Sequence, residues 1–97
     1  MKKTNRVSNK LRRRFAQITD LPEDLIMGLS KMVLLGKKEF YIENYKGIKE
    51  YENNKINVKT INGDVVIEGD NLSIEEINDS ELVVRGAIKK ILLEGEE

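Results

Sequence analysis

From residue 31 onward, apolar and polar residues alternate with a period of two, a pattern typical of strands that bury one face. Ile56, Val58 and Thr60 are the clearest example, because the residues between them are polar. Turn-forming residues interrupt the pattern roughly every eight to twelve positions. The sequence therefore predicts about seven short strands, at 38–43, 48–51, 56–60, 65–68, 72–77, 81–85 and 87–94, preceded by a short apolar run at 31–35.

The connections between these strands favour an antiparallel arrangement. Asn62-Gly63 is the strongest hairpin signal in the chain, because both residues tolerate a positive φ. No helical pattern of about ten residues separates the strands, as the crossovers of a parallel α/β sheet would require. We therefore expect a mainly β fold class, with a small domain built as an antiparallel meander, sandwich or barrel.

One internal similarity is visible in the strand region. The stretch Val65–Gly69 resembles Leu82–Gly86, and each consists of a strand, a glycine and then another strand. A single pair falls short of the three or so repeats that a solenoid needs. We interpret the two stretches as hairpins that share the same bend, with the glycine at a bulge that turns the strand.

The residues before position 31 follow a helical period instead. Leu11, Phe15 and Ile18 would share one face of a helix over 10–18, a length that is marginal in water without a partner. Asp20–Leu29 predicts a second helix, because its first residue can cap the free N–H groups and leucines recur every fourth position. We therefore expect one or two short N-terminal helices in front of the β domain.

The charge distribution separates the same two regions. The chain has 17 basic and 17 acidic residues, so its formal net charge is zero, yet residues 1–19 contain seven bases and no acid. We therefore divide the chain into a basic N-terminal arm, 1–19, and a single β-rich domain, 20–95. The candidate binding residues of the arm are Lys2, Lys3, Arg6, Lys10, Leu11, Arg12, Arg13, Arg14 and Phe15.

Several interpretations of this arm stay open. It can be a disordered tail that only keeps the protein in solution. It can also bind an anionic membrane surface, where each Lys or Arg contributes roughly 1 kcal/mol. Its apolar side chains can insert shallowly into such a surface or dock on a partner protein. The sequence does not choose among the three.

The composition argues against catalysis. The chain has no Cys and no His, which removes thiol nucleophiles, imidazole bases and most zinc sites. Its carboxylates mostly occupy polar strand positions or turns, as on a solvated face. Gly63, Gly69 and Gly86 lie between strands and not before a helix, so they do not form a phosphate-binding loop. We expect a protein that is not an enzyme and has no catalytic residue, metal site or cofactor.

The aromatic residues suggest an alternative function. Phe40, Tyr41, Tyr45 and Tyr51 lie close to several lysines, as in platforms that stack single-stranded nucleic acid. Interspersed glutamates would repel phosphate, however, so nucleic-acid binding is the alternative function and not the main one. We expect Phe40 to face the core together with Ile42, and Tyr41 to face the opposite side.

Four stretches carry a resemblance to a known family. They are Asp20-Leu-Pro-Glu-Asp24, Phe40-Tyr-Ile-Glu-Asn-Tyr-Lys-Gly-Ile48, Val65-Val-Ile-Glu-Gly69 with Leu72-Ser-Ile74, and Leu82-Val-Val-Arg-Gly86 running into Ile91-Leu-Leu-Glu94. Together they resemble the YabP/YqfC-like sporulation proteins of endospore-forming bacteria, and the YqfC-like members more than the YabP-like ones. The resemblance covers roughly residues 10–94.

This resemblance implies a non-enzymatic sporulation protein made in the mother cell. It implies a cytoplasmic protein, peripheral at the outer membrane of the developing spore, that acts as an assembly or adaptor module in spore envelope or coat formation. A membrane-associated sporulation protein is the implied partner, and unpaired strand edges also allow a homo-oligomer. The most distinctive motif supplies a candidate contact surface, which consists of Tyr41, Glu43, Asn44, Lys46 and Gly47.

Overall fold

The computed structural model describes residues 28–95 of the chain. The basic arm and the helix expected at 10–18 lie outside the described residues, as does most of the helix expected at Asp20–Leu29. Gly28, the first described residue, has a φ of 87°.

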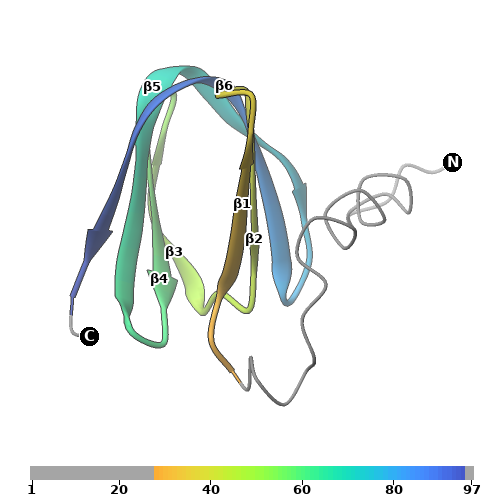
Figure 1. Cartoon of the computed structure of the whole chain (residues 1–97), viewed down its shortest axis with the longest axis vertical. Helices are drawn as coiled ribbons and strands as arrows, with labels where there is room; N and C mark the ends of the chain where they lie inside the picture. Colours follow the sequence, from red (N-terminus) through yellow and green to blue (C-terminus); the bar gives the residue numbers. More distant parts are fainter. Residues whose placement is uncertain (1–27, 96–97) are drawn as a thin grey trace, which may run out of the picture.

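Six strands form a single sheet in which every neighbouring pair is antiparallel (Figure 1). Their order across the sheet is β1-β2-β6-β5-β4-β3. The bounds are β1 Lys31–Leu35, β2 Glu39–Glu43, β3 Gly47–Glu52, β4 Lys55–Thr60, β5 Gly63–Ile77 and β6 Glu81–Glu94. The expected mainly β, antiparallel fold is confirmed, and the apolar run at 31–35 is itself a strand.

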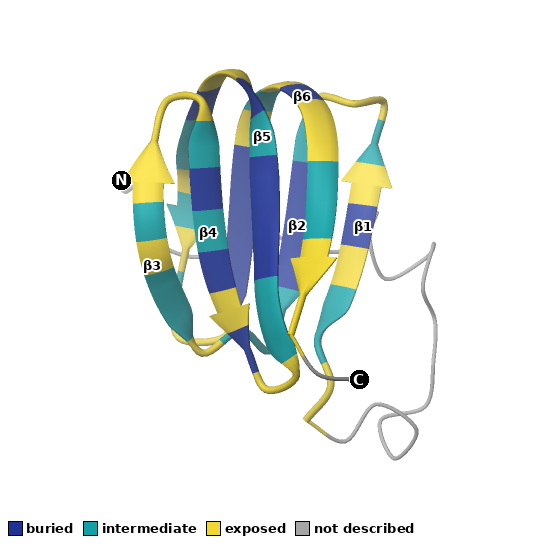
Figure 2. Ribbon diagram, turned by 90° about the vertical axis from the view of Figure 1, so that its left-hand side faces the viewer, coloured by how far each residue is buried: buried dark blue, intermediate teal, exposed yellow. Residues whose placement is uncertain are grey.

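The two longest strands bend, so that the two halves of the sheet face each other as layers (Figures 1 and 2). Layer one consists of β3, β4, residues 63–68 of β5 and residues 88–94 of β6. Layer two consists of β1, β2, residues 81–85 of β6 and residues 72–77 of β5. The sequence predicted four separate strands here, but the structure has two. The segments 65–68 and 72–77 both belong to β5, and 81–85 and 87–94 both belong to β6.

Glycines make this bend possible. The register of β5 against β6 shifts between Glu68 and Gly69 and again between Asp70 and Ser73, as the bulge interpretation requires. A Cβ atom on Gly69 would overlap the carbonyl oxygen of Ala87. Gly86 has a φ of 148°, which side-chain-bearing residues rarely adopt. The two similar stretches lie in the two paired strands of one hairpin, β5 and β6, so the interpretation as two separate hairpins is wrong.

The hairpin expected at Asn62-Gly63 is confirmed between β4 and β5, but its turn is displaced by one residue. Thr60 pairs with Gly63, so the two loop residues are Ile61 and Asn62. Only Gly63 has a positive φ, of 138°. The Thr60 hydroxyl donates to the Gly63 carbonyl oxygen at 2.8 Å and accepts from the Asn62 N–H at 3.3 Å. This side-chain bonding stabilises a turn that does not need a positive φ at Asn62.

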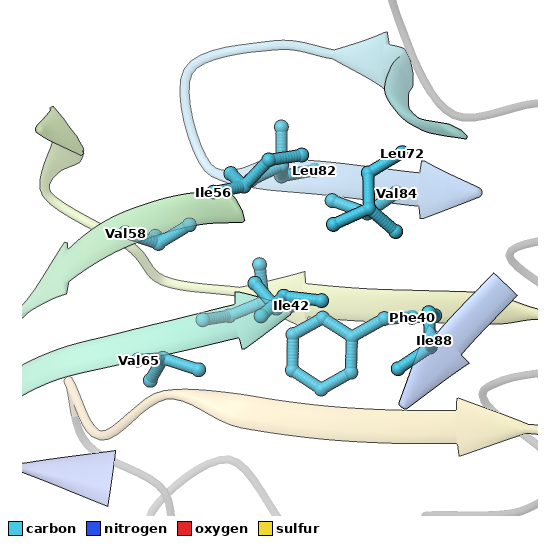
Figure 3. Close-up of a cluster of buried hydrophobic side chains, with 10 residues drawn as sticks. Phe40, Ile42, Ile56, Val58, Val65, Leu72, Leu82, Val84 and Ile88 are labelled. Atoms are coloured by element: carbon cyan, nitrogen blue, oxygen red, sulfur yellow. The ribbon is translucent and has the colours of Figure 1, made fainter. Parts of the chain in front are cut away.

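The main core lies between the two layers (Figure 3). Its buried members are Phe40, Ile42, Ile56, Val58, Val65, Ile67, Leu72, Leu82, Val84 and Ile88. Burying one such side chain stabilises the fold by about 1.5–3 kcal/mol relative to leaving it exposed. The sequence expectation for β2 is confirmed, since Phe40 and Ile42 face this core and Tyr41 belongs to a separate cluster.

Candidate interaction surfaces

The outer face of layer two carries an excess of acidic residues. Strand pairing places four carboxylates on it, and an ion pair of Glu75 with Arg85 at 3.9 Å adds a fifth, against two basic side chains. The acids are Glu39, Glu43, Glu75, Glu76 and Glu81, and the bases are Lys31 and Arg85. We call this surface the acidic face. Arg85 Nε lies 2.9 Å from a carboxylate oxygen of Glu39, and Lys31 Nζ lies 3.3 Å from one of Glu43.

An apolar cluster lies in the middle of the acidic face. Val33, Tyr41 and Val83 lie side by side on β1, β2 and β6, and they are only 7%, 2% and 0% exposed. Leu35 packs against them from the end of β1. Side chains on the outside of a two-layer sheet are ordinarily polar and solvated. The acidic face therefore has a buried centre, with charged side chains around it.

The hydroxyl of Tyr41 lies between two carboxylates. It is 3.1 Å from an oxygen of Glu81 and 3.3 Å from one of Glu43, and its single proton is donated to one of them at a time. Burial, followed by the negative charges of Glu43 and Glu81, raises the pKa of Tyr41 far above its usual range. Tyr41 is therefore a hydrogen-bond donor at any ordinary pH, and it helps to hold the buried carboxylate of Glu81.

Glu81 is the main correction to the expected solvated carboxylates, since its exposure is only 4%. The Asn78 side-chain amide donates to it at 3.1 Å. The Asn78 side-chain oxygen accepts from the backbone N–H of Glu81 at 2.8 Å. Sequence reasoning missed this residue because its burial depends on β6 pairing with β2, two strands far apart in the chain. The turn signal at Asn78 was the only local indication.

Asn44 fastens the start of the described chain to one end of the acidic face. It has a φ of 70°, a conformation that Asn tolerates better than most residues. Its side-chain amide donates to the Leu29 carbonyl oxygen at 3.1 Å, and its own carbonyl oxygen accepts from the Ser30 hydroxyl at 2.8 Å. Its backbone N–H donates to the Ser80 carbonyl oxygen at 2.7 Å. The residues before β1 are thereby held beside the β5–β6 turn.

The candidate contact motif is thus distributed over several environments. Tyr41 is buried, Glu43 and Asn44 are partly buried and bonded as described, and Gly47 begins β3. Lys46 is exposed, and its backbone N–H donates to the Lys59 carbonyl oxygen at 2.7 Å. The candidate residues of the arm, from Lys2 to Phe15, lie outside the described residues.

A second surface lies between β1, at an edge of layer two, and residues 88–94 of β6, at an edge of layer one, and no other described strand pairs with either edge. Figure 2 shows the two segments on the same side of the molecule. We call it the open seam. A groove along it is lined by Leu29 and Met32 on one side and by Val65 and Leu93 on the other. Leu34 lines a further hollow beside Ile88 and Ile91. The seam exposes Leu29, Met32, Leu34 and Leu93 by 48%, 36%, 45% and 69%.

The geometry of residues 28–95 does not provide a metal site, a membrane-spanning helix or a surface for stacking nucleic-acid bases. No group of three acidic side chains is arranged there to hold a metal ion. The described part of the chain also includes no helix long and apolar enough to cross a membrane. The aromatic residues do not share a stacking surface, because Phe40 and Tyr41 are buried on opposite faces of β2 and Tyr45 donates to the Asn78 carbonyl oxygen at 2.6 Å.

The family match covers this same β-rich region. The sequence model of the YabP family matches residues 28–97, which include every described strand. The chain belongs to the YabP family. It is also similar to the uncharacterized protein YqfC of Bacillus subtilis (strain 168), with 26% identity over 80 residues, or 82% of this chain and 86% of YqfC. Membership of the YabP family confirms the resemblance seen in the sequence and indicates a sporulation-related protein.

Proposed function

We propose that this protein is a non-enzymatic assembly or adaptor module of spore envelope or coat formation, and that it binds a membrane-associated sporulation protein. The sporulation setting rests on the YabP family. The partner and the envelope or coat role are those implied by the resemblance. The proposed place of action is the cytoplasm of the mother cell, at the outer membrane of the developing spore.

The observation that carries the binding role is the open seam. Two strand edges that no other described strand pairs lie on one side of the molecule, next to Met32, Leu34 and Leu93. Such an edge can accept an additional strand from a partner, in which backbone hydrogen bonds supply affinity and apolar contacts supply specificity. An extended apolar segment of the partner fits this surface, and it would occupy the groove beside Leu29.

A matched pair of substitutions tests the seam. Leu93→Asp places a charge on the seam, whereas Ile61→Asp makes the same kind of change at the β4–β5 turn, where the side chain is also mostly exposed at 56%. In affinity capture from sporulating cells, we expect the natural chain and Ile61→Asp to retain one membrane protein that detergent solubilises. Leu93→Asp should lose it. Equal capture by both variants would exclude the seam as the binding surface.

The arm is tested separately by deleting residues 1–14 from a fluorescent fusion. This deletion removes all seven basic residues that precede residue 19. If the arm attaches the protein to the spore's outer membrane, the fluorescence should become diffuse in the mother cell. Unchanged localisation would remove the anchoring role and leave attachment to the seam. Sedimentation of the purified chain shows whether a second copy pairs with the seam instead.

A further inference from the structure

We propose that the segment 10–18 of the arm docks on the acidic face of its own chain and covers the apolar cluster there. This inference goes beyond the proposed function and requires neither a partner nor a membrane. It concerns the acidic face and leaves the open seam free for assembly.

The first argument is the burial of the apolar cluster. Residues 28–95 consist of the strands of one sheet joined by turns of two or three residues, so none of them forms another layer over this face. Val83 is nevertheless fully buried and Tyr41 almost so. A segment laid over this buried centre would exclude water from the carboxylates around it, where charge pairing with the segment's cations is then stronger.

Charge complementarity is the second argument. The acidic face has five carboxylates and two basic side chains. The segment 10–18 has Lys10, Arg12, Arg13 and Arg14 and no acid. Its Leu11, Phe15 and Ile18 recur at helical spacing, so one segment offers apolar side chains with cations on either side of them. The acidic face presents the matching arrangement, an apolar centre surrounded by carboxylates.

Connectivity supplies the third argument. The arm leads into Leu29 and Ser30, which Asn44 fastens beside Glu43 at one end of the acidic face. Arg14 precedes Leu29 by fifteen positions. Even at the helical rise of 1.5 Å per residue, these span about 22 Å. The four strands of layer two span only about 14 Å from first to last. The segment can therefore reach every carboxylate of the face without strain.

The short connection between the segment and the acidic face also favours docking within one chain. A segment tethered this closely meets the face at an effective concentration of about millimolar or above. Another protein would have to compete with that concentration. The buried carboxylate of Glu81 is the preferred neighbour for an arginine, because charge pairing is stronger where water is excluded.

The experiment uses the full chain, which has no cysteine of its own. Ala16→Cys allows a nitroxide label on the side of the predicted helix opposite Leu11, Phe15 and Ile18. Amide NMR signals are then compared between Tyr41 and Val83 on the acidic face and Asn57 and Val66 on the outer face of layer one. We expect signal loss at Tyr41 and Val83 but not at Asn57 or Val66, in the absence of membrane or partner.

Two matched triple variants identify the docked segment. Arg12→Glu, Arg13→Glu and Arg14→Glu together should restore the signals of Tyr41 and Val83. Lys2→Glu, Lys3→Glu and Arg6→Glu together make the same charge change nearer the N-terminus and should leave the signal loss in place. Equal restoration by both variants, or equal signal loss on both outer faces, would overturn the assignment to 10–18.

A mixing experiment distinguishes the chain's own arm from that of a second copy. Chains that carry the nitroxide but no ¹⁵N are mixed with ¹⁵N chains that carry no nitroxide. Signal loss in this mixture reports only contacts between molecules. We expect no loss at Val83 in this mixture. A loss as large as in the doubly labelled chain would replace intramolecular docking by a dimer. Both NMR results are independent of partner capture. If docking is not observed, the proposed function still stands, and if no partner is captured, the docking proposal still stands.

Discussion

The outer face of layer one has one buried apolar side chain at its centre, Val66 of β5 at 3% exposure, beside the polar Asn57 of β4. Lys49 of β3 lies 2.9 Å from Asp64 of β5, across β4. The outer face of layer two carries Tyr41 and Val83 in the corresponding central positions, both buried. Both faces come from alternating strands of one sheet. Alternation predicts which residues share a face, but it does not predict how large a buried apolar centre that face will have.

The two outer faces also differ in the direction in which they shift the pKa of a titratable group. On layer one, the hydrogen bond and the charge of Lys49 lower the pKa of the partly exposed carboxyl of Asp64. On layer two, burial raises the pKa of Tyr41. An exposed ion pair contributes little to stability, because water can replace either partner. A buried polar group destabilises the fold unless a hydrogen-bond partner lies in a fixed position beside it.

The largest expected effect tests whether the face of layer two is buried in solution. Val83→Asn places an amide in a fully buried apolar site, and we expect it to lower the free energy of unfolding by about 3–5 kcal/mol. The control Lys90→Asn lies on the exposed outer face of layer one and should change it by no more than about 0.5 kcal/mol. Urea unfolding measures both. Similar losses would mean that the two faces are equally solvated.

The second prediction concerns the bend that joins the two layers. In Gly86→Ala, the added Cβ would lie 2.7 Å from the Asn71 carbonyl oxygen at a φ of 148°. We expect a loss of about 1–3 kcal/mol in the free energy of unfolding. Gly47→Ala is the matched control, because a Cβ there meets nothing within 4 Å. If both variants unfold alike, the bend does not depend on this glycine.

The third prediction isolates the Tyr41 hydroxyl. Tyr41→Phe removes a hydrogen bond to a buried carboxylate and should cost about 1–2 kcal/mol at neutral pH. The pKa of Tyr41 is raised in the folded state. The stability that its hydroxyl contributes is therefore fully present below the unfolded pKa of about 10 and is lost as pH rises above that value. The difference between the natural chain and Tyr41→Phe should therefore shrink above about pH 10. Denaturant titrations at successive pH values measure it, and a constant difference would contradict the raised pKa.

The smallest effect is expected on layer one. Lys49→Met removes the exposed partner of Asp64. Pairs of this kind are screened by salt and contribute little to stability. We expect no resolvable change in the urea midpoint at physiological ionic strength, and a clear destabilisation would show that this outer face also contains a structured charge network.

Local patterns in the sequence predicted the strands well, because burial on one face leaves a period of two at Ile56 and Val58. They also placed Phe40 and Tyr41 on opposite sides of β2. The continuous β5 and β6 were missed, since Gly69 and Gly86 look like strand ends in a sequence. The cluster of Tyr41, Glu43 and Glu81 was beyond prediction because it depends on strand order, which long-range packing decides.

The bent β5–β6 hairpin makes each layer depend on the other. Both layers contain parts of the same two strands, so separating the layers exposes the main core and disrupts β5 and β6 at the bend between them. A domain of this kind lacks an independently stable half. Native-state hydrogen exchange should accordingly show the slowest amides of β2 and β4 opening together in one global unfolding event.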